Sequence, residues 1–138
     1  MSKRFTYEVP REIGNMFEEL DSRAYSIAAA GLYDGADKIA DEIKENIPVD
    51  SGDLASSLFI ARFERGLNRV DTVIGFAGYD SKGTPNPLKA AVLESGTSDG
   101  KHPATHFFSR ATRNAKSRAE AAIEEKIEKK INEITGGT

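Results

Sequence analysis

The chain has 138 residues, which can enclose one hydrophobic core but not two. Hydrophobic residues make up 38% and charged residues 30%, the balance of a somewhat polar soluble protein, and the core must be built without tryptophan. The absence of cysteine excludes disulfides, thiolate zinc sites and cysteine nucleophiles, while a net charge of −3 argues against a free-standing duplex DNA-binding protein.

Residues 1–10 are polar and are predicted to form a flexible arm that ends at Pro10. Because no apolar segment follows the basic start of the chain, we expect no signal peptide, and no stretch approaches the roughly 20 consecutive apolar residues of a membrane span. We therefore expect a soluble intracellular protein. Residues 11–20 place hydrophobic side chains at helical spacing, which predicts a short amphipathic helix.

A longer helix is predicted over residues 24–47, with Ser22 as a candidate cap and Pro48 as its stop. Gly31 and Gly35 each weaken a helix by up to ~1 kcal/mol, so they indicate close packing of another element or a bend. The hydrophobic stripe of this helix consists of Ala28, Leu32, Ala36, Ile39, Ile43 and Ile47.

The hydrophobic period then changes from that of a helix to that of strands. A turn over residues 49–54 leads into a short helical piece near residues 54–57. Residues 59–63 and 70–76 both alternate with a period of two, and a Gly/Asn turn at 66–69 joins them, which predicts a β-hairpin. An isolated hairpin is only marginally stable, so it must pack on the long helix or pair with further strands.

Two loops and two helices complete the chain. Residues 79–87 and 96–105 are predicted to be loops, on either side of a short helix over residues 88–93. A last helix is predicted over residues 111–134, before a frayed tail at 135–138. Its narrow stripe lies either on the domain core or on another chain, and consists of Ala119, Ile123, Ile127, Ile131 and Ile134.

Together these elements predict an α+β fold. A long N-terminal helix and a long C-terminal helix are expected to pack against a small antiparallel sheet built on a β-hairpin. No internal repeat is visible, so the whole of residues 1–138 is expected to form a single domain.

Side chains that could carry chemistry are few and isolated. His102 and His106 are four residues apart, but Pro103 between them argues against a helical zinc site. Ser51 has no GxSxG context, and its turn suits a helix cap better than an activated nucleophile. We therefore expect no enzyme, no metal and no cofactor, with a hydrolase acting through Ser51 or the histidines as a third hypothesis.

A basic cluster surrounds the start of the last helix, beside Phe107 and Phe108. It suits nucleic-acid contact, so a small nucleic-acid-binding or regulatory module using residues 101–118 is the alternative function. The same helix turns acidic from Glu120, and such segregated charge also suits contacts between neighbouring subunits, which we favour. The cluster comprises Lys101, Arg110, Arg113, Lys116 and Arg118.

Three segments, in this order, resemble the motifs of one known protein family. Residues 48–54 (PVDSGDL) resemble its Pro-Val-Asp-Thr/Ser-Gly-x-Leu motif after a long helix. Residues 91–97 (AVLESGT) resemble a hydrophobic-Glu-x-Gly-Thr segment, and 103–111 (PATHFFSRA) resemble a Pro-x-x-Pro-Phe-hydrophobic-x-x-Ala segment that opens the last helix. With these three segments the chain resembles the tail-component family of long-tailed bacteriophages, of the HK97 type, and the resemblance covers roughly residues 16–121. The chain departs from the family pattern at two places. His106 occupies a position at which the family usually has proline, and Ala90–Ala91 occupy positions at which an aromatic-alanine pair is common.

The resemblance implies a structural virion assembly protein of a phage or prophage, acting in tail completion or head–tail joining. It implies a ring-like homo-oligomer, for which a hexamer is one candidate, and contacts with tail-tube, tail-terminator or connector proteins. It brings no catalytic residue, no cofactor and no membrane. The protein would occupy the host cytoplasm during assembly and then the tail or neck of the virion.

The same motifs supply candidate interface and structural residues. Gly52 is expected at a positive φ, which would penalise Gly52→Val. Glu94 is expected to hold the following loop by accepting backbone N–H bonds. The predicted contact surfaces are the turn 50–54, the loop 79–87, the segment 94–106 and the C-terminal helix. The candidate residues are Asp50, Ser51, Gly52, Leu54, Glu94, Gly96, Thr97, Phe107 and Phe108.

Overall fold

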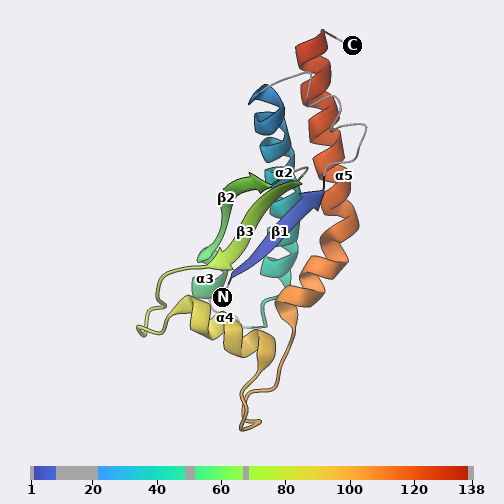
Figure 1. Cartoon of the computed structure of the whole chain (residues 1–138). Helices are drawn as coiled ribbons and strands as arrows, with labels where there is room; N and C mark the ends of the chain where they lie inside the picture. The colour runs from blue at the N-terminus through green and yellow to red at the C-terminus, as the bar shows by residue number, and fades with distance from the viewer. Residues whose placement is uncertain (1, 9–21, 49–51, 67–68, 137–138) are drawn as a thin grey trace.

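A computed structural model of the chain confirms the predicted α+β class (Figure 1). The predicted helix over residues 11–20 lies outside the described residues. The structure describes residues 2–8, 22–48, 52–66 and 69–136. Its elements are β1 (Ser2–Glu8), α2 (Ser22–Asn46), α3 (Gly52–Ser56), β2 (Leu58–Gly66), β3 (Arg69–Phe76), α4 (Asn86–Ser95) and α5 (Phe107–Thr135).

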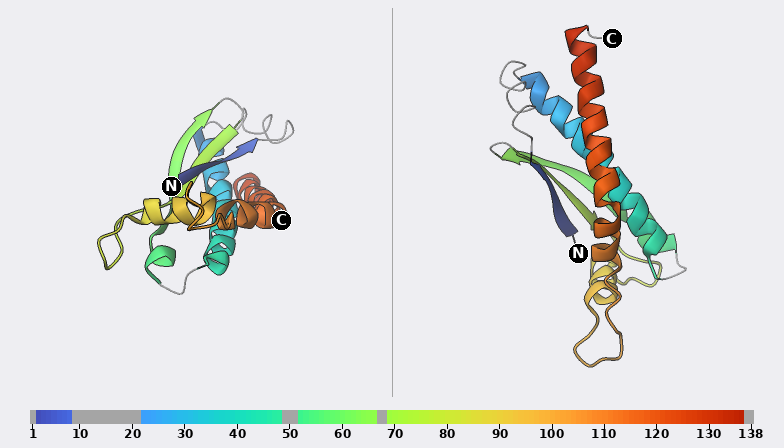
Figure 2. Two further views of the ribbon diagram at one scale, coloured as in Figure 1. Left: turned by 90° about the horizontal axis from the view of Figure 1, so that it is seen from below. Right: turned by 90° about the vertical axis from the view of Figure 1, so that its right-hand side faces the viewer.

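Two long helices, α2 and α5, run side by side in opposite directions and cross at an angle (Figure 2). The predicted stripe of α2 is buried from Ala28 to Ile43, and Ile47 is half-buried. On α5, Ala119, Ile123 and Ile127 are at most 1% exposed, and Ile131 is also buried. The isoleucine stripe of the last helix therefore lies on the core of this domain, as one of the two predicted alternatives had it.

Gly31 and Gly35 allow the two helices to approach closely. A Cβ added at Gly35 would lie 2.6 Å from Ile123 Cγ1 and 3.0 Å from the carbonyl oxygen of Ala119. A Cβ at Gly31 would lie 3.0 Å from Ile127 Cγ1. Glycine lowers the intrinsic stability of α2, because its backbone loses more conformational freedom in a helix. In return, the backbone of α2 can rest directly on side chains and carbonyls of α5.

The sheet lies against one side of the helix pair (Figure 1) and has three antiparallel strands in the order β1-β3-β2. The predicted hairpin is confirmed as β2 and β3, which pair from Leu58 opposite Phe76 onward. On the central strand, Thr72, Ile74 and Phe76 share one face and are buried, and Asp71 and Gly75 on the other face are buried as well. The hairpin contacts α2, and Ile74 and Phe76 join one core cluster with side chains from the start of α5.

The prediction of a flexible arm over residues 1–10 was wrong for residues 2–8. These residues form β1, which pairs with β3 from Ser2 opposite Gly75 to Glu8 opposite Arg69. A central strand needs hydrogen-bond partners on both edges, and β2 supplies only one of them. The N-terminal strand fills the other edge, which gives the sheet the third strand that an isolated hairpin lacks.

Helices α4 and α5 begin two and four residues earlier than predicted, and α2 and α3 also begin two residues early. The predicted loop ends before Pro87, because α4 begins at Asn86 and holds this proline in its first turn, where an N–H group has no helical partner. Helix α5 begins at Phe107, four residues before the predicted start. The reason for this second difference is a buried carboxylate, described in the next subsection.

We expect Gly35→Val to lower the free energy of unfolding by about 1–3 kcal/mol, because the new side chain overlaps Ile123 and the Ala119 carbonyl. This net loss comes in spite of the better helix propensity of valine. The measurement is chemical denaturation followed by circular dichroism. Gly52→Ala is the matched control, since no atom lies within 4 Å of the added Cβ, and equal stability losses in the two variants would contradict the packing argument.

Candidate functional site

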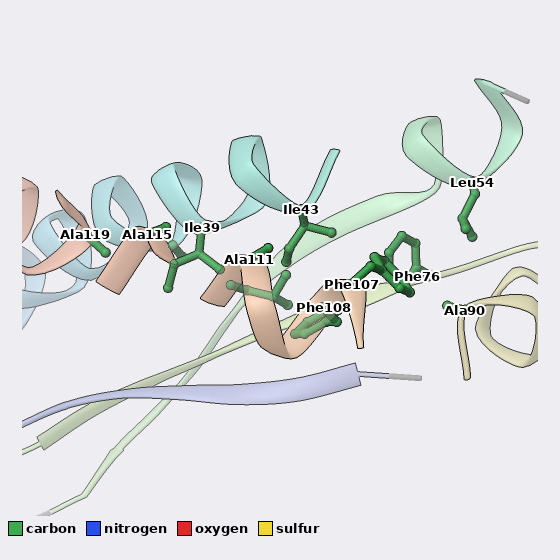
Figure 3. Packing of buried hydrophobic residues seen from close by; sticks show 12 residues of the cluster. Ile39, Ile43, Leu54, Phe76, Ala90, Phe107, Phe108, Ala111, Ala115 and Ala119 are labelled. Atoms are coloured by element: carbon green, nitrogen blue, oxygen red, sulfur yellow. The ribbon is translucent and has the colours of Figure 1, made fainter. Parts of the chain in front are cut away.

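The three motif segments meet at one end of the molecule, where α3, α4 and the start of α5 lie together (Figure 1). Leu54 from the first segment and Phe107 from the third are fully buried, and Phe108 is 2% exposed. Figure 3 shows these side chains directed into one cluster with Phe76 and Ala90. Leu54, Phe107 and Phe108 are therefore core residues that hold this end together, and they do not form a contact surface.

Three phenylalanine rings fix the position of α5 against the sheet. Phe76 lies 6.1 Å from Phe107 and 6.2 Å from Phe108, measured between ring centroids, and the two neighbours on α5 are 6.4 Å apart. The planes are tilted by 54–76°. Such edge-to-face pairs contribute ~0.5–1.5 kcal/mol each beyond their burial, so the start of α5 is held firmly.

Glu94, at the end of α4, is buried and receives hydrogen bonds from the first turn of α5. The Phe108 N–H donates to Glu94 Oε1 at 2.7 Å, and the Ser109 N–H lies 3.4 Å from both carboxylate oxygens. The Ser109 hydroxyl donates to Oε2. Helix α5 has no side-chain cap of its own at His106, so Glu94 supplies one from another helix.

This geometry extends the expected role of Glu94. The carboxylate accepts backbone N–H bonds, as predicted, but from residues beyond the loop and not within it. Negative charge at a helix N-terminus is stabilising by ~0.3–1 kcal/mol and up to ~2 kcal/mol when partly buried. The cap explains why α5 begins at Phe107, because the N–H groups of its first turn have a fixed acceptor.

The loop between α4 and α5, residues 96–106, is held at its base by further backbone bonds. The Thr105 N–H and hydroxyl both donate to the Leu93 carbonyl, at 2.9 and 2.6 Å. The His106 N–H donates to the Glu94 carbonyl at 3.1 Å. The returning chain therefore lies against the last turn of α4, and the loop projects from the end of the molecule (Figure 2).

Thr97 orders the projecting part of this loop. Its N–H donates to the His102 carbonyl at 2.9 Å, and its hydroxyl donates to Asp99 Oδ1 at 2.6 Å. The Lys101 N–H donates to the same carboxylate oxygen at 2.9 Å. The hydroxyl bond, followed by the Lys101 backbone bond, lowers the pKa of Asp99 below its ordinary value of 3.8. Residues 98–104 are nevertheless all exposed, so they form an ordered, solvent-exposed surface.

Gly96 and His106 occupy unusual backbone conformations at the two ends of this loop. Gly96 has φ 74° and ψ −174°, a region open almost only to glycine. His106 has φ 52° and is the only non-glycine residue with positive φ among those that the structure describes. Proline cannot adopt this φ, and it has no N–H group that could donate to the Glu94 carbonyl as His106 does. A proline at this position could therefore not support the local geometry that this chain has.

A second ordered loop, residues 77–85, precedes α4. Asp80 Oδ1 accepts hydrogen bonds from the N–H groups of Lys82 at 2.9 Å and Thr84 at 2.8 Å, while Oδ2 lies 2.8 Å from the Lys89 ammonium on α4. The bond from Lys89, the largest cause, and that from Thr84 lower the pKa of Asp80 below its ordinary value of 3.8. The ion pair with Lys89 spans the loop and α4, and no local pattern in the sequence indicated it.

Two large apolar side chains are exposed beside this second loop. Tyr79 is 73% exposed and Leu88 is 57% exposed. Both exceed Tyr33, 43% exposed, on the outer side of α2. Tyr79 falls within the predicted contact loop, whereas the sequence analysis placed Leu88 only in a short helix and did not single it out. Exposed aromatic and aliphatic side chains on an ordered surface are typical of protein contacts.

The predicted turn 50–54 is only partly described. Asp50 and Ser51 lie outside the described residues, and so does the hypothesis of a nucleophilic Ser51. Gly52 was expected at a positive φ, and this was wrong: it begins helix α3, its φ lies outside the left-handed region, and its surroundings are open. Glycine-specific geometry is found in the second motif segment, at Gly96.

The basic cluster divides into two parts. Arg118 lies 3.0 Å from Glu42 on α2, so it links the two long helices. Lys101, Arg110, Arg113 and Lys116 are exposed, and none has an ion-pair partner within the described part of the chain. The charge available to an external partner is therefore on the outer side of α5 and on the projecting loop.

His102 and His106 are both exposed, one within the loop and one at its end. Over residues 2–8, 22–48, 52–66 and 69–136, no three His, Asp or Glu side chains are grouped as metal ligands. Nor is any helix in these ranges both long enough and apolar enough to cross a membrane.

We expect Glu94→Ala to lower the free energy of unfolding by about 1.5–3 kcal/mol, since the buried Phe108 N–H loses a charged acceptor. Glu94→Gln keeps one acceptor oxygen and should lose less. Faster hydrogen exchange at the Phe108 amide is the local readout. Glu120→Ala, an exposed change on the same helix, is the control; if it costs as much as Glu94→Ala, the capping role is wrong.

Gly96→Ala should destabilise the protein by at least ~2 kcal/mol, because a Cβ there would lie 2.7 Å from the Ala104 nitrogen and the His102 oxygen. Gly100→Ala is the matched control, with a similar φ of 75° but no atom within 4 Å of the added Cβ, and should cost only ~1 kcal/mol. Thermal unfolding of both variants tests the difference, and equal losses would show that crowding at Gly96 does not matter.

Comparison with known proteins agrees with this arrangement. The family model described as "Bacteriophage HK97-gp10, putative tail-component" matches residues 11–80, just over half of the chain. The match includes the segment 48–54 and the hairpin, while the two later motif segments lie beyond it. No curated protein and no solved structure matches the chain significantly. The chain belongs to the HK97-gp10-like family of bacteriophage tail-component proteins.

Proposed function

We propose that this protein is a structural component of a phage or prophage virion that acts in tail completion or head–tail joining. The observation that carries the proposal is the family match over residues 11–80. The three motif segments support it, because their described residues together build one end of the molecule.

The work of the protein, on this proposal, is done by surfaces and not by catalysis. The motif residues Leu54, Phe107 and Phe108 are buried under the end that carries both loops. Glu94 and Asp80 then hold the loops in fixed conformations. A preordered surface loses little conformational entropy on binding, which suits a protein whose task is to fit between larger assemblies.

The loop-bearing end is the proposed contact for tail-tube, tail-terminator or connector proteins. Residues 98–104 project from it, and Tyr79 and Leu88 provide exposed apolar area beside them. Large apolar side chains within an ordered polar surround are where binding energy concentrates in protein interfaces.

The proposal also includes self-association. We propose a ring-like homo-oligomer, with a hexamer as one candidate, that is made in the host cytoplasm and then retained in the tail or neck. A ring suits a junction between tubular assemblies, because closed cyclic symmetry presents the same end of every copy to the same partner. Neither long helix would need to rearrange, since their stripes already pack on each other.

We expect the combined variant Tyr79→Ser/Leu88→Ser to fold normally, because both side chains are exposed, but to bind tail-tube or connector proteins at least ~10-fold more weakly. In a phage that lacks the gene, it should fail to restore plaque formation, with separate heads and tails visible by electron microscopy. Glu125→Ser, an exposed change on α5 away from both loops, is the control and should complement fully. Normal virions in the absence of the protein would exclude the proposed function.

A further inference from the structure

We propose that copies of this chain associate through two charged helix faces: the basic face of α5 on one copy and the acidic face of α2 on the next. This inference rests on the proposed function, of which it specifies the self-association. The basic face is defined by Arg110, Arg113 and Lys116, and the acidic face by Asp37, Asp41 and Glu45.

The basic face lies on the outer side of α5. Its three residues are spaced by three, so they share one side of the helix, and all are exposed. Ala111 and Ala115, between them in sequence, are fully buried on the opposite side. Within the chain as the structure describes it, none of the three cations is in an ion pair.

The acidic face has the same character on α2. Its residues are spaced by four, are exposed, and alternate with the buried Ile39 and Ile43. The neighbouring acidic residues Asp34 and Glu42 are paired with α5, at 3.8 Å from Lys126 and 3.0 Å from Arg118. Among the described residues, the carboxylates of the acidic face have no ion-pair partner, so their charge is available to another molecule.

The two faces lie at overlapping levels along the helix pair. Gly35 rests beside Ala119, and Glu42 meets Arg118, so the antiparallel helices bring the second half of α2 alongside the first half of α5. Each face points away from the core that the helices share. Two copies can therefore stand side by side with their loop-bearing ends aligned. Because different faces meet, the contact is head-to-tail and can close into a ring.

The continuation of the basic face favours a second copy over nucleic acid. Glu120 and Glu124 follow on the same side of α5 and are exposed, so a phosphate backbone lying along the helix would meet repulsion there. The positive charge on this side of α5 is therefore confined to a short stretch, which suits the similarly short acidic face of a second copy.

Charge reversal tests the pairing. Arg113→Glu/Lys116→Glu and Asp41→Lys/Glu45→Lys should each weaken self-association at least ~10-fold in sedimentation velocity, since like charges then face each other. An equimolar mixture of the two variants should associate again, and so should one chain that carries all four changes. Association of the wild type should weaken as salt is raised. Glu128→Lys, an exposed change farther along α5, is the control and should associate normally.

Three results would overturn the inference: a wild type that stays monomeric at high concentration and low salt, reversed variants that associate normally, or a mixture that does not recover. Duplex DNA is included as a separate probe. Binding of DNA that Arg113→Glu/Lys116→Glu abolishes, without self-association of the wild type, would assign the basic face to nucleic acid. If the protein is monomeric but phage heads and tails fail to join without it, this inference is refuted and the proposed function stands. If the protein associates through these faces but normal virions form in its absence, only the proposed function is refuted.

Discussion

The distance between α2 and α5 is set where Gly31 and Gly35 rest on the isoleucines of the last helix. A side chain at Gly35 would meet the backbone carbonyl of Ala119 as well as Ile123, so the helices can separate but cannot accommodate it in place. The contact also determines the register of the pair, and with it the position of Phe107 and Phe108 under the hairpin. The sheet packs on α2 and reaches α5 through Phe76, so its placement follows from the same contact.

Glu94 connects this core to the exposed end. Its carboxylate is buried, yet its partners belong to the first turn of α5, and its own carbonyl receives the N–H of His106. These bonds hold the two ends of the loop 96–106 close together, and they do not depend on which side chains the exposed residues of the loop carry. Such an arrangement separates two requirements: the core specifies where the loop begins and ends, and the exposed residues specify what it contacts.

Periodicity predicted most of the fold because most elements are amphipathic. The stripes from Ala28 to Ile43 and from Ala119 to Ile131 were identified as buried, and the alternation of residues 59–63 and 70–76 identified the hairpin. Strand β1 was missed because its stability comes from pairing with β3, about 70 residues away, and its local sign is limited to the alternation of Phe5 and Tyr7 with polar residues.

The site was predictable at the level of residue type but not of partner. A carboxylate before a glycine suggested an acceptor at Glu94, whereas its donors, Phe108 and Ser109, became clear only once α4 and α5 were placed together. The positive φ expected at Gly52 belongs to Gly96, since backbone angles depend on the return path of the chain. The ion pair of Asp80 with Lys89 and the exposure of Leu88 likewise depend on the angle at which α4 leaves the loop.

The pairing of the first long helix with the last has a consequence for how the chain folds on the ribosome. Arg118 and Glu42 are separated by 76 residues, and most contacts of α2 are with α5. During synthesis, α2 emerges early, and its hydrophobic stripe has no partner helix until α5 follows. Nascent chains therefore expose apolar surface for much of their elongation, and the native core closes late, in a step governed by distant contacts. We therefore expect the yield of folded protein in cells to depend on chaperones that bind the exposed stripe of α2.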